Sequence, residues 1–159
     1  MEIMNSTELA RFIEQNEVEA EILFLQSETP TVAAAAEALG VQPDQIIKSV
    51  LFLADDQPVL VIANGLARIN RKRLADELSM SRRRVKMADE GQVNAIAGYA
   101  IGAVPPFGHP QKLETVIDQG VLQQDEVFGG GGEINALMRV PVPELQRVTA
   151  GYIVEIADR

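Results

Sequence analysis

The stretch Gly98-Tyr-Ala-Ile-Gly-Ala-Val-Pro-Pro-Phe-Gly-His109 is the segment around which the rest of the chain is organised. Its glycines and prolines lie too close together for a regular helix or a central strand, because proline lacks the amide donor and glycine costs backbone entropy. The pattern therefore predicts a rigid, bent loop. Glycine lets a backbone pass close to a ligand and proline fixes the following turn, so this loop suits a binding site made of main-chain groups.

Lys48 is the second feature, and it interrupts the apolar run Ile46-Ile-Lys-Ser-Val-Leu-Phe-Leu53. An ammonium in an apolar strand must reach water, a partner or a ligand to avoid a large desolvation cost. It is either a cation at the mouth of a pocket or a strand lysine whose head reaches solvent over apolar neighbours. A Ser49–Lys48 dyad is disfavoured, because adjacent strand residues point to opposite faces. We expect the Lys48 nitrogen and the Gly102 amide to face one hollow.

Helical and strand patterns surround these two features. Helices are predicted over 5–16, 31–39, 70–78, 89–98 and 143–148. Strands are predicted over 20–26, 47–53, 59–63, 85–87, 114–118 and 135–140, with a last strand or helix end over 152–156. Asp55-Asp-Gln57 predicts an antiparallel hairpin between two of the strands. Since no regular βαβ period appears, the fold class is α+β, with a largely antiparallel mixed sheet or a partly closed barrel surrounded by helices.

Composition limits the class of protein. A chain of 159 residues without a visible linker or repeat predicts one domain over 1–159. The absence of cysteine and the presence of one histidine exclude disulfides, thiolate nucleophiles and multi-histidine metal sites. Glu2 stands where a signal peptide would need basic residues, and no apolar run approaches about 18 residues. We therefore expect a cytoplasmic protein with no metal and no membrane partner.

Positive charge is concentrated although the net charge is -9. Residues 68–86 contain eight basic and two acidic side chains, whereas the remainder contains six basic and 21 acidic ones. Such a patch can guide a polyanion to one face of an acidic protein, or it can be an ordinary solvated helix and turn. The candidate tRNA-binding residues within it are Arg71, Lys72, Arg73, Arg82, Arg83 and Arg84.

Three motifs in order resemble the YbaK/EbsC family, the stand-alone relatives of the editing domain inserted in bacterial prolyl-tRNA synthetases. They are Pro43-Asp-Gln-Ile-Ile-Lys-Ser49, Val85-Lys-Met-Ala-Asp89 and Gly98-Tyr-x-x-Gly-x-x-x-Pro-x-Gly108. The resemblance runs from the end of the first predicted helix to the C-terminus. It implies the editing-domain fold and hydrolysis of the ester of mischarged tRNA, with tRNA-Pro carrying cysteine or alanine as the expected substrate.

The same resemblance implies the roles of individual residues. Lys48 binds the tRNA terminus and Gly102 frames the reacting carbonyl, while water attacks with help from a neighbouring ribose hydroxyl. This catalysis relies on proximity and backbone polarisation, so no cofactor is expected. The partners implied are aminoacyl-tRNA and an aminoacyl-tRNA synthetase. The implied substrate-binding residues are Thr31, Ala103, Pro106, Phe107, Gly108, Gly130 and Gly131.

Two positions depart from the family pattern. The run Gly129–Gly132 has only glycines where relatives carry a polar or basic residue, and we interpret it as a flexible wall. Pro105 stands where many relatives place a small or hydroxyl residue.

His109 at the rim of the loop fits a surface or hydrogen-bonded residue better than a general base. Two alternatives stay open: a non-catalytic module that binds tRNA or a synthetase, and a fold that binds an unrelated small molecule.

Overall fold

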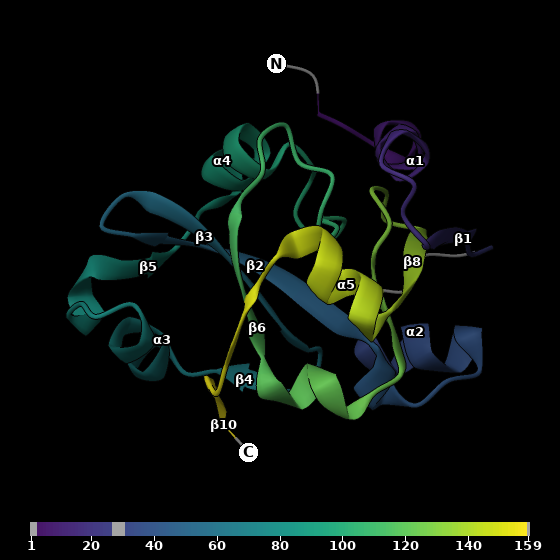
Figure 1. Ribbon diagram of the computed structural model, residues 1–159. Helices are drawn as coiled ribbons and strands as arrows, with labels where there is room; N and C mark the ends of the chain where they lie inside the picture. Colours follow the sequence, from purple (N-terminus) through teal and green to yellow (C-terminus); the bar gives the residue numbers. More distant parts are fainter. Residues whose placement is uncertain (1–2, 27–30, 159) are drawn as a thin grey trace.

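A five-stranded mixed sheet lies at the centre of the computed structural model, which describes residues 3–26 and 31–158 (Figure 1). Its strands in spatial order are β5 (Val85–Met87), β2 (Ile47–Ala54), β3 (Gln57–Asn64), β6 (Glu114–Asp118) and β9 (Tyr152–Val154). The first three are antiparallel to one another, whereas β6 runs parallel to β3, and β9 runs parallel to β6.

The predicted hairpin is confirmed as β2 and β3. Asp55 and Asp56 form its two-residue turn with φ of 53° and 68°. Positive φ at both positions matches the twist of the flanking strands, which is why such short turns favour residues that tolerate this region. The turn fixes the register, so Lys48 lies opposite Ala63 and Ser49 opposite Ile62.

Two smaller sheets complete the strand structure. The antiparallel sheet β1-β8-β7 consists of β1 (Glu21–Phe24), β8 (Ala136–Pro141) and β7 (Glu126–Gly130). A single parallel bridge between Ile46 and Phe128 connects its β7 to the start of β2. The third sheet pairs β4 (Arg68–Ile69) with β10 (Ala157–Asp158). The strands of the described residues thus form three open sheets, and the α+β expectation with a mixed sheet is confirmed.

Helices cover these sheets, and side-chain caps mark the starts of several of them. The α-helices are α1 (Ser6–Gln15), α2 (Val32–Leu39), α3 (Arg71–Glu77), α4 (Glu90–Gln92) and α5 (Val142–Thr149). Shorter helical turns are η1 (Pro43–Gln45), η2 (Arg82–Arg84), η3 (Val93–Ala97) and η4 (Gln119–Gln123). Asn5 and Glu8 form a capping box at α1, and the Thr31 and Asn70 side chains cap α2 and α3. The predicted helix over 89–98 is instead α4 followed by the π-helical η3.

Tyr99 holds the organising loop against the core. The side chain is fully buried, and its hydroxyl donates a hydrogen bond of 2.8 Å to the Gly108 carbonyl. Burial raises the pKa of the Tyr99 hydroxyl, so this group stays a donor at neutral pH. Gly102 and Gly108 have φ of 89° and 86°, the left-handed region that favours glycine. The predicted bent loop is therefore fixed by its own backbone and by one buried hydrogen bond.

Among the residues described, no helix has both the length and the apolar character that crossing a bilayer requires.

Candidate functional site

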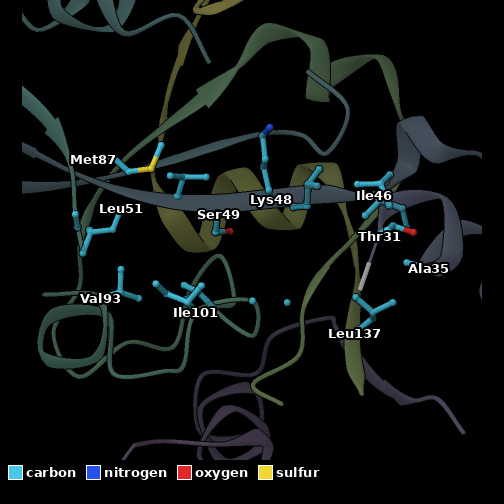
Figure 2. A pocket seen from close by; sticks show the side chains of 17 residues that line it. Thr31, Ala35, Ile46, Lys48, Ser49, Leu51, Met87, Val93, Ile101 and Leu137 are labelled. Carbon is cyan, nitrogen blue, oxygen red and sulfur yellow. The ribbon is translucent and has the colours of Figure 1, made fainter. Parts of the chain in front are cut away.

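A hollow of about 390 Å³ lies beside β2 (Figure 2). Its lining comes from the start of α2, from β2, from the end of β5, from the organising loop and from the sheet that contains β7 and β8. Lys48 and Gly102 both belong to the lining, together with Thr31 and Gly130. Most of the other side chains are apolar, among them Val93, Ile101 and Leu137, as is usual for small-molecule sites.

The hollow exists because part of β2 has no neighbour on one edge. On that edge β5 pairs with β2 only from Phe52 to Ala54, and the Ala88 N–H then donates to the Leu51 carbonyl at 2.9 Å. At the other end, the bridge between Phe128 of β7 and Ile46 is the pairing that the described residues show with this edge. Between these two points no strand of the described chain pairs with the outer edge. Side chains from both faces of β2 therefore line the hollow.

Ser49 lies in the middle of this free edge. In an antiparallel ladder the main-chain groups of alternate residues point to the same edge. Since the Leu51 carbonyl points outward to Ala88, the N–H and C=O of Ser49 also point outward, into the gap. The Ser49 hydroxyl is itself buried and has no hydrogen-bond partner within the described residues. The hollow therefore has polar groups on an otherwise apolar wall.

The Lys48 ammonium is held by the loop that follows β3. Its Nζ donates to the carbonyl of Gly65 at 3.4 Å and to that of Ala67. Burial lowers the pKa of Lys48. Figure 2 shows the side chain rising on one side of β2, whereas Ser49 and Ile101 lie on the other. Both Lys48 and Gly102 thus contribute to the lining, but the Lys48 nitrogen is directed to the Gly65 and Ala67 carbonyls and not to the Gly102 amide.

A second hollow of about 450 Å³ adjoins the first. The two share Lys48, Val50 and Met87 in their linings. Arg68 and Arg71 complete the polar part of the second hollow. Three cations therefore lie on a continuous path that leads out of the first hollow along the side of β2.

All six basic residues predicted to bind tRNA are exposed. They lie on α3 and on η2, in the same part of the chain as β4 and β5. Arg71 reaches the second hollow, and Arg73 donates to the Ala157 carbonyl at 3.2 Å. Arg84 forms an ion pair with Asp55, which lowers the pKa of that carboxyl. The predicted patch therefore contains cations already engaged within the protein as well as Arg71, which lies beside Lys48.

The organising loop faces two different hollows. Gly102 lies at the hollow beside β2, whereas Pro106, Phe107 and Gly108 line a third hollow of about 280 Å³ on another side. Ala103 is buried, and its carbonyl accepts a hydrogen bond of 3.0 Å from the Gly132 N–H. Of the predicted substrate-binding residues, the structure brings only Thr31 and Gly130 to Lys48 and Gly102. The Thr31 hydroxyl also caps α2 by accepting from the Ala34 N–H.

The glycine run is packed backbone and not the flexible wall that we expected. Gly129 and Gly130 are the last residues of β7, paired with β8. A Cβ on Gly130 would lie 2.2 Å from the Val104 carbonyl oxygen, and one on Gly131 would lie 2.6 Å from the Ala136 carbonyl carbon. Glycine is required here because the protein's own backbone passes close by.

His109 lies outside the hollow beside β2. Its Nε2–H donates to the Pro105 carbonyl at 2.8 Å, and the ring meets Tyr99 edge to face. Burial lowers the pKa of His109 to about 4, against a smaller opposing effect of the Pro105 hydrogen bond. The imidazole is therefore neutral at pH 7, and this geometry fits a structural hydrogen bond. In residues 3–26 and 31–158, no group of three or more histidines or acidic residues is placed to hold a metal ion.

Sequence reasoning missed two residues of the site. Ser49 was considered only as a partner for Lys48, although it lines the hollow and its main chain points to the open edge of β2. Arg68 lies within the basic window but was not among the predicted contacts, and it lines the second hollow. The hairpin register was the available signal for Ser49, because register and turn type determine which main-chain groups point outward.

Comparisons with known proteins point to a single family. Residues 26–148 match the family model described as an aminoacyl-tRNA editing domain. Protein YwhH of Bacillus subtilis is 30% identical over 128 residues, which cover 80% of each chain. The proline–tRNA ligase of Lactiplantibacillus plantarum is 32% identical over 103 residues, 65% of this chain but 18% of the ligase. A solved structure described as a candidate trans-editing enzyme for prolyl tRNA synthetase has a TM-score of 0.90 at 26% identity, and the match covers 97% of both chains.

Proposed function

Since the chain belongs to the aminoacyl-tRNA editing domain family, we propose that it hydrolyses the ester that links an amino acid to the 3′ end of mischarged tRNA. The observation that carries this proposal is the shared hollow, in which Lys48 and Gly102 line the same 390 Å³ as the free edge of β2. This volume lies within the range of roughly 300 to 1,000 Å³ that is usual for small-molecule sites.

The proposed reaction needs no cofactor. The oxygen of a water molecule attacks the ester carbonyl carbon, and the carbonyl electron pair moves to its oxygen. When the carbonyl re-forms, the bond to the ribose oxygen breaks, and that oxygen takes up a proton that came from the water. An aminoacyl ester is already activated, so positioning and polarisation by main-chain donors supply the acceleration. Gly102 at the rim frames the carbonyl, and a ribose hydroxyl assists the water.

In the same proposal Lys48 and the basic patch bind the nucleic acid. Lys48 lines both hollows, which supports a role for its ammonium in holding a terminal phosphate. Arg71 extends this positive path towards α3. The rest of the chain is strongly acidic and repels a polyanion, which orients an incoming tRNA to this side.

The finer parts of the proposal concern the substrate and the partners. We propose tRNA-Pro that carries a small amino acid such as cysteine or alanine, with Thr31 and Gly130 beside the acyl group. This agrees with a solved neighbour described as a candidate trans-editing enzyme for prolyl tRNA synthetase. A synthetase is then a natural partner, because it releases the mischarged product. Action on charged tRNA also requires the cytoplasmic location that the sequence predicts.

A panel of mischarged tRNAs tests the proposal. Each tRNA is incubated with the protein, and the loss of the acyl ester is compared with its loss in buffer. We expect the ester of at least one small amino acid on tRNA-Pro to be cleaved faster than the correctly charged prolyl ester. Ester loss at the buffer rate across the whole panel would exclude the deacylase function.

The second candidate function is a module that binds tRNA ends or a synthetase without hydrolysis. One observation favours it: the single histidine of the chain lies outside the hollow, as a hydrogen-bonded residue beside Pro105. This function predicts tRNA binding that weakens with salt and an intact ester throughout the panel. The same tRNA set therefore decides between the two.

A further inference from the structure

The free edge of β2 offers one donor and one acceptor on a single residue. The N–H and C=O of Ser49 point into the hollow, between the part of β2 covered by β5 and the bridge to β7. An uncovered strand edge of this kind is a template for another main chain, since paired N–H and C=O groups satisfy each other. Such an edge is commonly paired with a neighbouring strand, but here a hollow of about 390 Å³ lies beside it.

An aminoacyl group has the complementary pattern. Its α-ammonium is a donor and its ester carbonyl is an acceptor, and one carbon separates the two, as in a residue of a strand. The N–H and C=O on one side of Ser49 therefore match the acceptor and the donor of a single amino acid. The wall is otherwise largely apolar, which strengthens each hydrogen bond made there.

We propose that the aminoacyl group of the substrate pairs with Ser49 as a one-residue strand on the edge of β2. The Ser49 carbonyl accepts from the α-ammonium, and the Ser49 N–H donates to the carbonyl oxygen that is attacked. The inference rests on the proposed function for the identity of the ester, but it concerns binding and not turnover. It assigns Ser49 a role in recognising a free α-amino group.

This pairing has two consequences for the chemistry. The Ser49 N–H strengthens its bond as negative charge develops on the carbonyl oxygen, so it stabilises the tetrahedral intermediate from the strand while Gly102 lies on the loop side. Residues opposite each other in an antiparallel pair have their side chains on the same face. The amino acid side chain then lies on the face of Ser49 and Ile101, where the buried Ser49 hydroxyl has no partner in the described chain (Figure 2).

The test compares two stable analogues of the aminoacylated tRNA end. One is adenosine with an alanyl group in amide linkage at the 3′ position, and the other carries a propionyl group, which lacks only the amine. We expect the alanyl analogue to bind about tenfold more tightly or better, the usual effect of a charge-assisted hydrogen bond. Equal dissociation constants, or no binding of either analogue, would overturn the proposal.

A proline substitution separates the main chain of Ser49 from its side chain. Ser49→Pro removes the outward N–H without removing a hydrogen bond between β2 and β3, as proline tolerates such edge positions. We expect both analogues to bind about threefold or more weakly in this variant, because both lose the bond to the N–H, and to keep their wild-type affinities in Ser49→Ala, which keeps the N–H. Unchanged affinity of a folded Ser49→Pro for both analogues would also contradict the pairing. If this variant does not fold, the two analogues with the wild-type protein still decide.

The two proposals fail in different ways. A protein that discriminates the two analogues but leaves every charged tRNA intact keeps the Ser49 pairing and loses the deacylase function. A protein that cleaves the esters but binds both analogues equally keeps the function and loses the pairing.

Discussion

The amide of Ala88 donates a hydrogen bond of 2.9 Å to the carbonyl of Leu51, and the covered part of the β2 edge ends at this bond. Beyond it the edge stays open until Ile46 meets Phe128. An open sheet edge inside a folded domain is usually covered or paired, because unpaired main-chain groups cost free energy away from water. The protein keeps this edge open between two fixed points, and the candidate site occupies the opening.

Lys48→Met tests the role of the ammonium while most of the apolar stem is kept. If Lys48 holds the tRNA end, we expect deacylation to fall by about 100-fold, the usual loss when one such contact is removed from a site. The melting temperature should change little, because the two carbonyls bonded by Lys48 lie in a partly exposed loop. Lys112→Met is the matched control, since Lys112 is exposed and lines a different hollow. Wild-type turnover in Lys48→Met would remove Lys48 from the mechanism.

Arg71→Ala tests the path from Lys48 to α3. Arg71 lines the second hollow, whereas Arg84 is bound to Asp55 at the hairpin turn. Each phosphate contact adds roughly one to the dependence of log affinity on log salt, so Arg71→Ala should reduce the slope by about one. Arg84→Ala should reduce it less. Binding of uncharged tRNA measured over a salt series checks both, and equal slopes in the two variants would contradict the assigned path.

Gly130→Ala tests the packing of the hollow wall. The added Cβ would lie 2.2 Å from the Val104 carbonyl oxygen, a contact that forces the backbone apart. We expect a loss of about 2 to 4 kcal/mol in the free energy of unfolding, typical of overpacking a tight backbone contact. Gly91→Ala is the control, because its Cβ would make only an ordinary contact of 3.5 Å on exposed α4. Chemical denaturation gives the free energy of unfolding of both variants. Equal values would show that the backbone around Gly130 adjusts to the added Cβ at little cost.

His109 makes stability depend on pH. The pKa of His109 is about 4 in the folded protein and 6.5 ordinarily. Between these two pH values the unfolded chain therefore binds a proton at this residue that the folded chain does not bind. The contribution of the neutral imidazole to the free energy of unfolding is fully present above pH 6.5 and is lost as the pH falls towards 4. Between pH 7.5 and pH 5 we expect roughly 1 to 2 kcal/mol less stability from this residue. Urea unfolding of the wild type and of His109→Asn at both pH values isolates the part of the pH dependence that comes from His109. A parallel pH dependence in the two proteins would rule out the buried, neutral imidazole.

Local sequence signals predicted most of the secondary structure. Helix starts followed from caps such as Asn5 with Glu8, and the main hairpin followed from Asp55 and Asp56 between two apolar runs. These signals act over a few residues, so one sequence contains them completely. The π-helical turn at Val93–Ala97 was missed, because the capping pattern at Asp89 marks where a helix begins and not how it winds.

The site was predicted in part, and the missing part depends on distant contacts. The motifs indicated that the Lys48 nitrogen and the Gly102 amide face one hollow; both residues line it, but the nitrogen bonds the Gly65 and Ala67 carbonyls. Phe107 faces elsewhere because its ring stacks on Phe12 of α1, with ring centroids 5.7 Å apart. The role of Ser49 depends on which strand fails to pair with β2. The packing of α1 against Phe107 and the missing strand beside Ser49 both depend on distant parts of the chain. Neither produces a local sequence pattern that predicts it.

The crowding at Gly130 and Gly131 also limits how this domain can diversify. Where backbone meets backbone, no side chain can be added without moving the loop at Val104 or the strand β8 at Ala136. Adaptation to a larger or more polar acyl group must therefore come through positions such as Ile101 of the loop and Leu137 of β8, which contribute side chains to the lining. Selection for new specificity, in nature or in a directed library, should accumulate changes there and leave the glycines intact.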